Sequence, residues 1–338
     1  MRCLTLAGEL RKRGAETVFV SREATEATAP ALTRSGIPVL GMRGADEASA
    51  LAALQIHWPQ GCDLLVVDSY GIDASAECGF RAAARHIAVI DDLANRAHDC
   101  DLLLDQTFGR SHEDYAALVP RHCQVFTGSQ YALLRPEFAA ARTASLIRRS
   151  ATGPVRRIMI SLGLADPGGI AEQVTRAVLD ATQGLAVDVV LGTRGPSFAP
   201  LKTLASAYPE LTVHIDPQDL CGLMVQADIA VGAAGSTMWE RCCLGLPAIA
   251  LILADNQRHA AQSLEAAGCC IALDARSGLP RSALRGALIE LTRGPALRKS
   301  LSARSSSVTD GQGALRIAAA VEMLLRPGSQ LTGQPASR

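Results

Sequence analysis

The strongest chemical signal in this 338-residue chain is a glycine-rich turn between an expected strand and an expected helix. The strand is predicted at Ile229–Val231 and the helix at Thr237–Leu244, with the residues GAAGS between them. Small side chains let a ligand approach the backbone, and the free amides that begin a helix favour a phosphate group. We therefore predict that Gly235, Ser236 and Thr237 bind phosphate. A tight turn without a ligand is the alternative.

Further polar residues follow this turn. Glu240 lies about one helical turn beyond Ser236, where its carboxylate would accept two hydroxyl groups of a ribose. A solvated helix glutamate is the alternative. After the next expected strand, Ala248–Leu253, come Asn256 and Gln257, whose amides suit a sugar or a phosphate, although a turn with a helix cap is the commoner explanation. The turn lacks both the GxGxxG spacing and the GK[ST] lysine, which argues against a dehydrogenase and against nucleoside-triphosphate hydrolysis.

Composition restricts the class of protein. The chain exceeds the ~250 to 300 residues at which a single core stops growing, so two domains are expected. Thirty-three basic residues balance thirty-three acidic ones, so we expect neither nucleic acid nor a membrane surface as a partner. The ten cysteines show no CxxC spacing, which argues against a metal site. The longest apolar stretch falls short of the ~20 residues that span a bilayer, and no secretory signal is recognisable, which predicts a cytoplasmic protein.

Strand-length apolar runs alternate with helical segments, which predicts parallel sheets in an α/β fold. The expected strands of the first half are Val18–Val20, Leu64–Val67, Ile87–Ile90, Leu102–Leu104 and Val125–Gly128, with helices at Glu47–Ile56 and Ala74–Ala84. Those of the second half are Ile158–Ser161, Val187–Leu191, Leu211–Ile215, Ile229–Val231 and Ala248–Leu253, with helices at Ile170–Asp180, Asp219–Gln226, Thr237–Leu244 and Gln257–Ala267. We expect domains at 1–140 and 155–313, a linker at 141–154, a closing helix at 314–326 and a flexible tail at 327–338. Met1–Arg13 is predicted to be an amphipathic helix, although a parallel α/β unit normally opens with a strand.

Several segments, in order, resemble the hydrolases of UDP-2,4-diacetamido-2,4,6-trideoxy-β-L-altropyranose, which act in pseudaminic acid biosynthesis and are relatives of the MurG-type glycosyltransferases. They are MRCLTLAGELRKRGA at the start, LLVVDSYGID from Leu64, IDDLANRAHDCDLLLDQ from Ile90, GSQYALLRPEF from Gly128, GSTMWERCCLGLPAIALILADNQ from Gly235 and DGQGALRIA from Asp310. The resemblance implies a GT-B-like α/β fold, with two doubly wound Rossmann-type domains facing a cleft and the first strand of domain 1 missing.

The resemblance also implies where the substrate binds. UDP would dock on the second domain, with Gly235, Ser236 and Thr237 near the diphosphate, Glu240 on the ribose, and Asn256 and Gln257 on the diphosphate or sugar. The family has a glycine pair after the strand Ile158–Ser161; here Leu164 replaces the second glycine, and Gly163 remains as a binding residue. The first domain would supply the groups around the sugar, and Asp68 and Tyr70 are the catalytic candidates because they follow a strand. A capping role for Asp68 and a packing role for Tyr70 are the alternatives.

In this family water attacks the anomeric carbon, the sugar C–O bond breaks with inversion, and UDP leaves without a required metal or cofactor. The base that activates the water is a histidine in an IGxGHxxRC segment, whereas this chain begins at MRC. This difference predicts a true start upstream of Met1, which the DNA sequence there would test. Two other functions stay open: a GT-B glycosyltransferase with a UDP-sugar donor, and a UDP-sugar-binding protein impaired in catalysis. We expect a monomer or a weak homo-oligomer.

Overall fold

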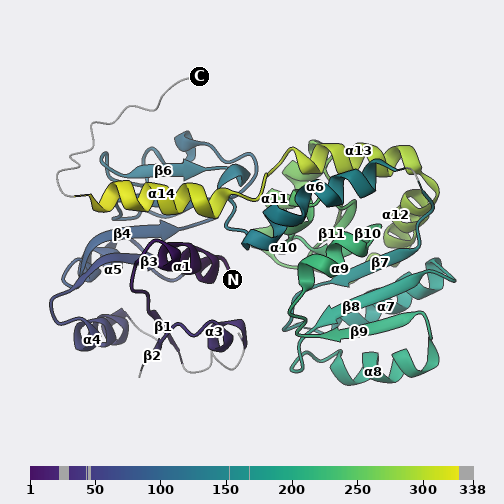
Figure 1. Cartoon of the computed structure of the whole chain (residues 1–338), viewed down its shortest axis with the longest axis horizontal. Helices are drawn as coiled ribbons and strands as arrows, with labels where there is room; N and C mark the ends of the chain where they lie inside the picture. Colours follow the sequence, from purple (N-terminus) through teal and green to yellow (C-terminus); the bar gives the residue numbers. More distant parts are fainter. Residues whose placement is uncertain (23–29, 43, 45–46, 152, 167, 327–338) are drawn as a thin grey trace. The chain divides into compact units, whose positions relative to one another are not determined.

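The computed structural model describes residues 1–22, 30–42, 44, 47–151, 153–166 and 168–326, which divide into two compact units. Unit 1 comprises Met1–Leu133 and the carboxyl-terminal part from Gln312, and unit 2 comprises Leu134–Gly311. Strands and helices alternate through each of them (Figure 1). The predicted tail at 327–338 lies outside the described residues. No described helix is both long enough and apolar enough to cross a membrane.

The described residues of unit 1 form two parallel sheets. One pairs β1 (Phe19–Arg22) with β2 (Val39–Met42), and the other has the order β3 (Cys62–Val67), β4 (Ala84–Ile90), β5 (Leu102–Asp105) and β6 (Gln124–Thr127). The helices are α1 (Arg2–Lys12), α3 (Pro30–Arg34), α4 (Glu47–His57), α5 (Ala74–Phe80) and α14 (Gly313–Leu325), with short 3-10 turns η1 (His112–Tyr115) and η2 (Ser129–Tyr131). The residues of β5 are all buried, as expected of an inner strand of a parallel sheet.

The predicted closing helix forms as α14 and belongs to unit 1. Figure 1 shows this yellow helix among the purple and blue elements, although it comes last in the chain. It packs against α1 and buries Ile317, Ala318 and Val321 in the same core as Leu6 of α1. Unit 2 therefore ends at Gly311 rather than at residue 313.

The segment predicted as a linker at 141–154 is mostly helical. Helix α6 spans Pro136–Ser150, and its proline lies in the first turn, where the absent N–H is not needed. Arg149 of this helix is buried and donates to the backbone carbonyls of Met224, Ala227 and Leu244, which ties α6 to unit 2. Alanine and arginine are strong helix formers, so the composition that suggested a linker also suits a helix.

Unit 2 is built on one parallel sheet with the strand order β12–β11–β10–β7–β8–β9. The strands are β7 (Arg157–Ser161), β8 (Ala186–Leu191), β9 (Leu211–Ile215), β10 (Ile229–Ala233), β11 (Ala248–Ile252) and β12 (Ile271–Asp274). The helices are α7 (Ile170–Ala181), α8 (Phe198–Ala207), α9 (Leu220–Gln226), α10 (Thr237–Cys243), α11 (Asp255–Ala266), α12 (Arg281–Arg293) and α13 (Pro295–Ser306) in addition to α6. This order is that of a doubly wound Rossmann-type domain.

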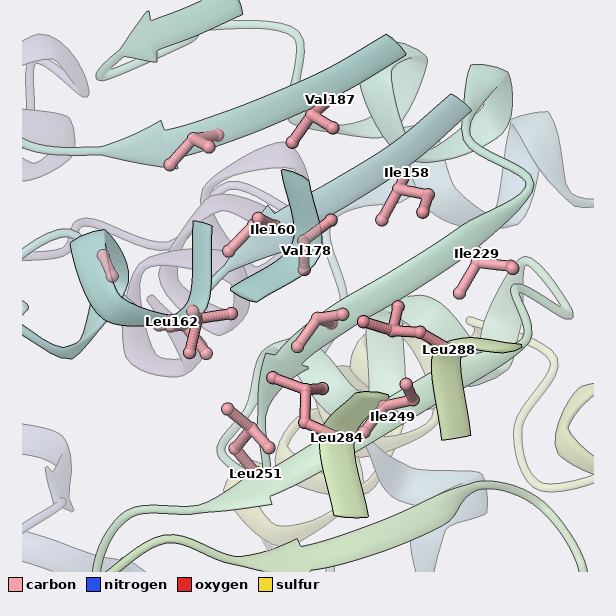
Figure 2. Close-up of a cluster of buried hydrophobic side chains, with 14 of the residues drawn as sticks. Ile158, Ile160, Leu162, Val178, Val187, Ile229, Ile249, Leu251, Leu284 and Leu288 are labelled. Carbon is pink, nitrogen blue, oxygen red and sulfur yellow. The ribbon is translucent and has the colours of Figure 1, made fainter. Parts of the chain in front are cut away.

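The core of unit 2 lies between one face of this sheet and its helices. Figure 2 shows Ile158 and Ile160, alternate residues of β7, on the same side as Ile229 of β10. Leu284 and Leu288 of α12 pack onto this layer, one helical turn apart. Apolar burial on this scale holds the strand ends rigidly, and those ends carry the predicted binding residues.

Candidate functional site

Three neighbouring strand ends of unit 2 carry the predicted binding residues. The strand order reverses between β7 and β10, and doubly wound sheets bind ligands beyond the carboxyl ends of the strands at such a point. Gly163 follows β7, Gly235–Thr237 follow β10, and Asn256 and Gln257 lie in the first turn of α11, after β11. Strand β10 pairs in parallel with both β7 and β11, so all of these residues lie at one edge of the sheet.

The short helix α10 is fixed at both ends. The amides of Met238 and Trp239 donate to the carbonyls of Gly235 and Ser236, at 2.9 and 3.2 Å, which closes the turn before the helix. At the other end Gly245 has φ +60°. Its amide donates to the carbonyl of Cys242 and the amide of Leu246 donates to that of Arg241, both at 2.9 Å, as is typical of a helix that ends at a glycine. The helix therefore begins at the position that the glycine-rich sequence predicts.

Glu240 is buried rather than solvated, with 8% of its surface exposed. Its Oε1 accepts from the guanidinium of Arg135 at 3.4 Å, whereas its Oε2 is buried and has no partner among the described residues. Burial raises the pKa of Glu240, and the positive charges of Arg135 and Arg241 offset only part of this effect. A buried carboxylate oxygen without a donor costs free energy, so the position suits a ligand that brings hydroxyl groups.

Gly235 and Gln257 lie side by side. A Cβ at Gly235 would stand 3.7 Å from the Gln257 side-chain nitrogen. The Gln257 oxygen accepts from the amide of Leu253 at 2.9 Å, which leaves the NH₂ group directed towards Gly235. Asn256 is exposed beside it in the same helical turn. Gly163, at φ +100°, is exposed and has open space where a Cβ would be.

In unit 1 the predicted catalytic residues belong to a cluster at the ends of two paired strands. Asp68 follows β3 and Asp92 lies just after β4, and these strands are hydrogen-bonded neighbours. Arg2, in the first turn of α1, donates from Nε and Nη2 to the two Asp68 oxygens, at 3.0 and 2.6 Å, and from Nη1 to Asp92 at 3.2 Å. Cys3 Sγ lies 3.0 Å from Asp68 Oδ2, and the Tyr70 hydroxyl donates to Asp92 at 3.1 Å.

The pKa values of the two carboxylates in this cluster, Asp68 and Asp92, are shifted in opposite directions. Burial disfavours ionised Asp68, but the hydrogen bonds and charge of Arg2 outweigh burial and lower the pKa of Asp68. For Asp92 burial is the larger effect and raises its pKa, despite Arg2 and Tyr70. One oxygen of Asp92, Oδ1, is buried without a partner in the described part of the chain. Asp92 is therefore the better proton acceptor near neutral pH.

A buried network holds this cluster in place. Asp91 accepts from Arg96 at 2.9 Å, and Arg96 also donates to the carbonyl of Ser69, which ties the loops after β3 and β4 together. The Tyr115 hydroxyl lies 2.9 Å from Asp91 and 2.8 Å from Asp105. Asp105 is the last residue of β5, at the same edge of the sheet. These contacts position the loops that carry Asp68, Tyr70 and Asp92, without requiring that they touch a substrate.

Sequence reasoning missed several members of both sites. Arg2, Cys3 and Asp92 join Asp68 and Tyr70 in unit 1, and Arg135 and Arg241 surround Glu240 in unit 2. All of them lie within segments that carry the family resemblance. Asp92 carries nearly the same signal that identified Asp68, because it is a carboxylate two residues beyond a predicted strand.

The architecture is that of the GT-B class. The structure is similar to MurG from Acinetobacter baumannii, with a TM-score of 0.65 and 14% identity over 95% of both chains. It is also similar to a UDP-GlcNAc 2-epimerase from Neisseria meningitidis bound to UDP-GlcNAc, with a TM-score of 0.64 and 15% identity over 96% of both chains. At these identities the likeness establishes the fold. No family model matches the chain.

Two curated proteins are similar in sequence. The spore coat polysaccharide biosynthesis protein SpsG of Bacillus subtilis is 25% identical over 208 residues, which are 61% of this chain and 60% of SpsG. The UDP-2,4-diacetamido-2,4,6-trideoxy-β-L-altropyranose hydrolase of Campylobacter jejuni is 24% identical over 208 residues, 61% of this chain and 72% of the hydrolase. The resemblance inferred from the motifs is thereby confirmed. The match spans less than two thirds of the length of SpsG.

Proposed function

We propose that this protein hydrolyses a UDP-activated 2,4-diacetamido-2,4,6-trideoxy sugar at the anomeric C–O bond, with inversion and release of UDP, in pseudaminic acid biosynthesis. The observation that carries the proposal is a buried oxygen of Glu240, beside the glycine-rich turn after β10, that has no hydrogen-bond partner among the described residues. This pairing suits a ribose joined to a diphosphate. The name of the Campylobacter jejuni relative supplies the sugar and the reaction.

In the proposed complex the turn residues Gly235, Ser236 and Thr237 bind the diphosphate through backbone amides and hydroxyl groups. Glu240 accepts the ribose hydroxyls. Asn256, Gln257 and Gly163 lie at the same edge of the sheet and are the proposed contacts to the diphosphate or the sugar. These roles need no metal or cofactor, and a cytoplasmic location belongs to the same proposal.

The chemical step is proposed for the cluster of unit 1. A water molecule attacks the anomeric carbon, its proton passes to Asp92, and the bond to the diphosphate oxygen breaks so that UDP leaves with the electron pair. Asp92 suits this role because its pKa is raised by burial and its Oδ1 is unpaired within the described residues. Asp68, held by two bonds from Arg2, and Tyr70, which donates to Asp92, orient the base.

Incubation of the full chain with the UDP-sugar alone, in ¹⁸O water, tests the reaction. We expect UDP to be released without an acceptor, and mass spectrometry to find the label on the sugar rather than on UDP. Label on UDP would contradict C–O cleavage.

A GT-B glycosyltransferase is the second candidate, supported by the MurG-like fold over 95% of the chain. Hydrolysis and glycosyl transfer both require that the protein bind UDP in the same way, so the UDP-binding residues alone do not distinguish the two reactions. Release of UDP only in the presence of an acceptor glycan would favour the transferase. Binding of UDP with no turnover under either condition would identify a UDP-sugar-binding protein.

A further inference from the structure

A second buried charge lies in α10, next to Glu240. Arg241 is 2% exposed and is the largest of the fully buried side chains described. None of the described aspartates or glutamates forms an ion pair with it, because the carboxylate of Glu240 is turned to Arg135 instead. Its Nε is buried and has no hydrogen-bond partner in the described part of the chain. Burial lowers the pKa of this guanidinium, and the nearby charge of Glu240 offsets only part of this effect, which reflects the cost of keeping a positive charge in the protein interior.

The guanidinium of Arg241 contacts both ends of the turn after β10. Its Nη2 donates to the carbonyl of Ala233 at 2.7 Å, and its Nη1 donates to the Thr237 hydroxyl at 3.1 Å. These two contacts bracket the turn, one at the last residue of β10 and one at the first residue of α10. Gly232 is the third contact, since a Cβ at this position would collide with the guanidinium. The absence of a side chain there is therefore required by Arg241.

We propose that Arg241 is a positioning residue that fixes the turn after β10 in its anion-binding form and gives this turn the net positive charge that selects a diphosphate. The inference rests on the proposed UDP site. Arg241 acts electrostatically through the turn and does not contact the ligand. A bound diphosphate adds negative charge that no ion pair with a described carboxylate supplies. The Thr237 hydroxyl accepts from Arg241, so its own proton is left to point towards a phosphate oxygen.

Arg149 provides a matched comparison within unit 2. It too is buried, and within the described residues it donates only to neutral oxygens, including the carbonyls of Met224, Ala227 and Leu244. Met224 and Ala227 precede β10, and Leu244 lies at the carboxyl-terminal end of α10, so none of these contacts is made to the glycine-rich turn. Arg149 is therefore expected to support folding and to have no part in phosphate binding.

The experiment compares UDP with uridine, which differs by the diphosphate alone. Isothermal titration calorimetry with the full chain measures both ligands against wild type, Arg241→Met, Arg241→Lys and Arg149→Met. We expect Arg241→Met to bind UDP about 10- to 100-fold more weakly, with uridine affinity changed by less than about threefold. Arg241→Lys keeps the charge but loses the paired hydrogen bonds to Ala233 and Thr237, so we expect a UDP affinity between those of wild type and Arg241→Met. Arg149→Met should lower the free energy of unfolding and leave the ratio of the two affinities unchanged.

Gly232→Ala gives a second route if Arg241→Met does not fold. The added methyl group displaces the guanidinium while the charge remains in the chain, and we expect UDP affinity to fall with uridine affinity kept. Equal losses for UDP and uridine, or unchanged UDP binding in a folded Arg241→Met protein, would overturn the role of Arg241 and leave the UDP site intact. Failure of the wild-type chain to bind UDP at all would overturn the UDP site itself, and this inference with it.

Discussion

Replacing Glu240 with glutamine tests whether the buried carboxylate holds the ribose. Glutamine keeps the shape of the side chain, but it loses the negative charge and brings an NH₂ group towards Arg135, which is itself a donor. A hydrogen bond to a charged group contributes about 1.5 to 3 kcal/mol, which corresponds to about 10- to 100-fold in affinity. We therefore expect Glu240→Gln to bind UDP about 10- to 100-fold more weakly than wild type does.

The effect on stability should have the opposite sign. The pKa of Glu240 is raised in the folded protein, so the folded state holds this proton more tightly than the unfolded state does. The resulting contribution to stability is present below the ordinary pKa of a glutamate and is lost as pH rises through the raised pKa. At neutral pH the ionised carboxylate thus opposes folding, and we expect Glu240→Gln to have an equal or higher free energy of unfolding. UDP affinity of wild type should fall as pH drops through the raised pKa, because the carboxylate then loses its charge.

Titration calorimetry with UDP and with 2′,3′-dideoxy-UDP measures this directly, and urea unfolding at neutral pH gives the stability. The dideoxy ligand should bind wild type and Glu240→Gln alike, since it lacks the hydroxyls that Glu240 accepts. Glu137→Gln is the control: Glu137 pairs with the same arginine, at 3.0 Å, but it is 43% exposed and should leave UDP affinity unchanged. Equal losses for both ligands in Glu240→Gln, or none for either, would refute the ribose contact.

Two further outcomes are expected in unit 1. Asp92→Asn should lower the rate of UDP release from the UDP-sugar about 10²- to 10⁴-fold, because asparagine accepts no proton from water, while UDP affinity by calorimetry stays as in wild type; an unchanged rate would exclude Asp92 as the base. Tyr115→Phe removes the hydroxyl shared by Asp91 and Asp105 and should lower the free energy of unfolding by about 1 to 3 kcal/mol in urea titrations, with UDP affinity unchanged. A stability equal to that of wild type would show that the network is dispensable for folding.

Most of the alternating strands could be predicted from the sequence because they form short apolar runs, and every residue of β5, β10 and β11 is buried. Leu211–Ile215 forms β9 with the predicted bounds, and β4 and β7 begin only a few residues from the expected positions. The strands β2 and β12 were not predicted. Both are short, and β12 has an exposed final residue, so neither gives a continuous apolar signal. Helix α6 was mistaken for a linker because contacts distant in sequence hold its arginines, and composition does not reveal such contacts.

The candidate sites were predictable in part. Glycines at a strand end indicated the position of the turn after β10, and the same rule of strand ends predicted Asp68 and Tyr70 as site residues. Burial was not predictable: the sequence left open whether Glu240 faces water, and the structure buries it. Arg241 could not be predicted from the sequence, because a basic residue in a surface helix and one buried against a glycine-rich turn look alike without tertiary contacts.

The geometry of α10 explains why two adjacent residues of opposite charge are both buried without forming an ion pair with each other. Successive helical residues point about 100° apart, so Glu240 and Arg241 face different sides of the helix and need separate partners. Glu240 pairs with Arg135 on one side, and on the other Arg241 donates, among the described residues, only to the neutral oxygens of Ala233 and Thr237. Each side chain keeps one buried atom unpaired within the described residues, which lowers stability in the free protein. A nucleoside diphosphate presents hydroxyls for the one and negative charge for the other, so its binding should stabilise this unit through both residues at once.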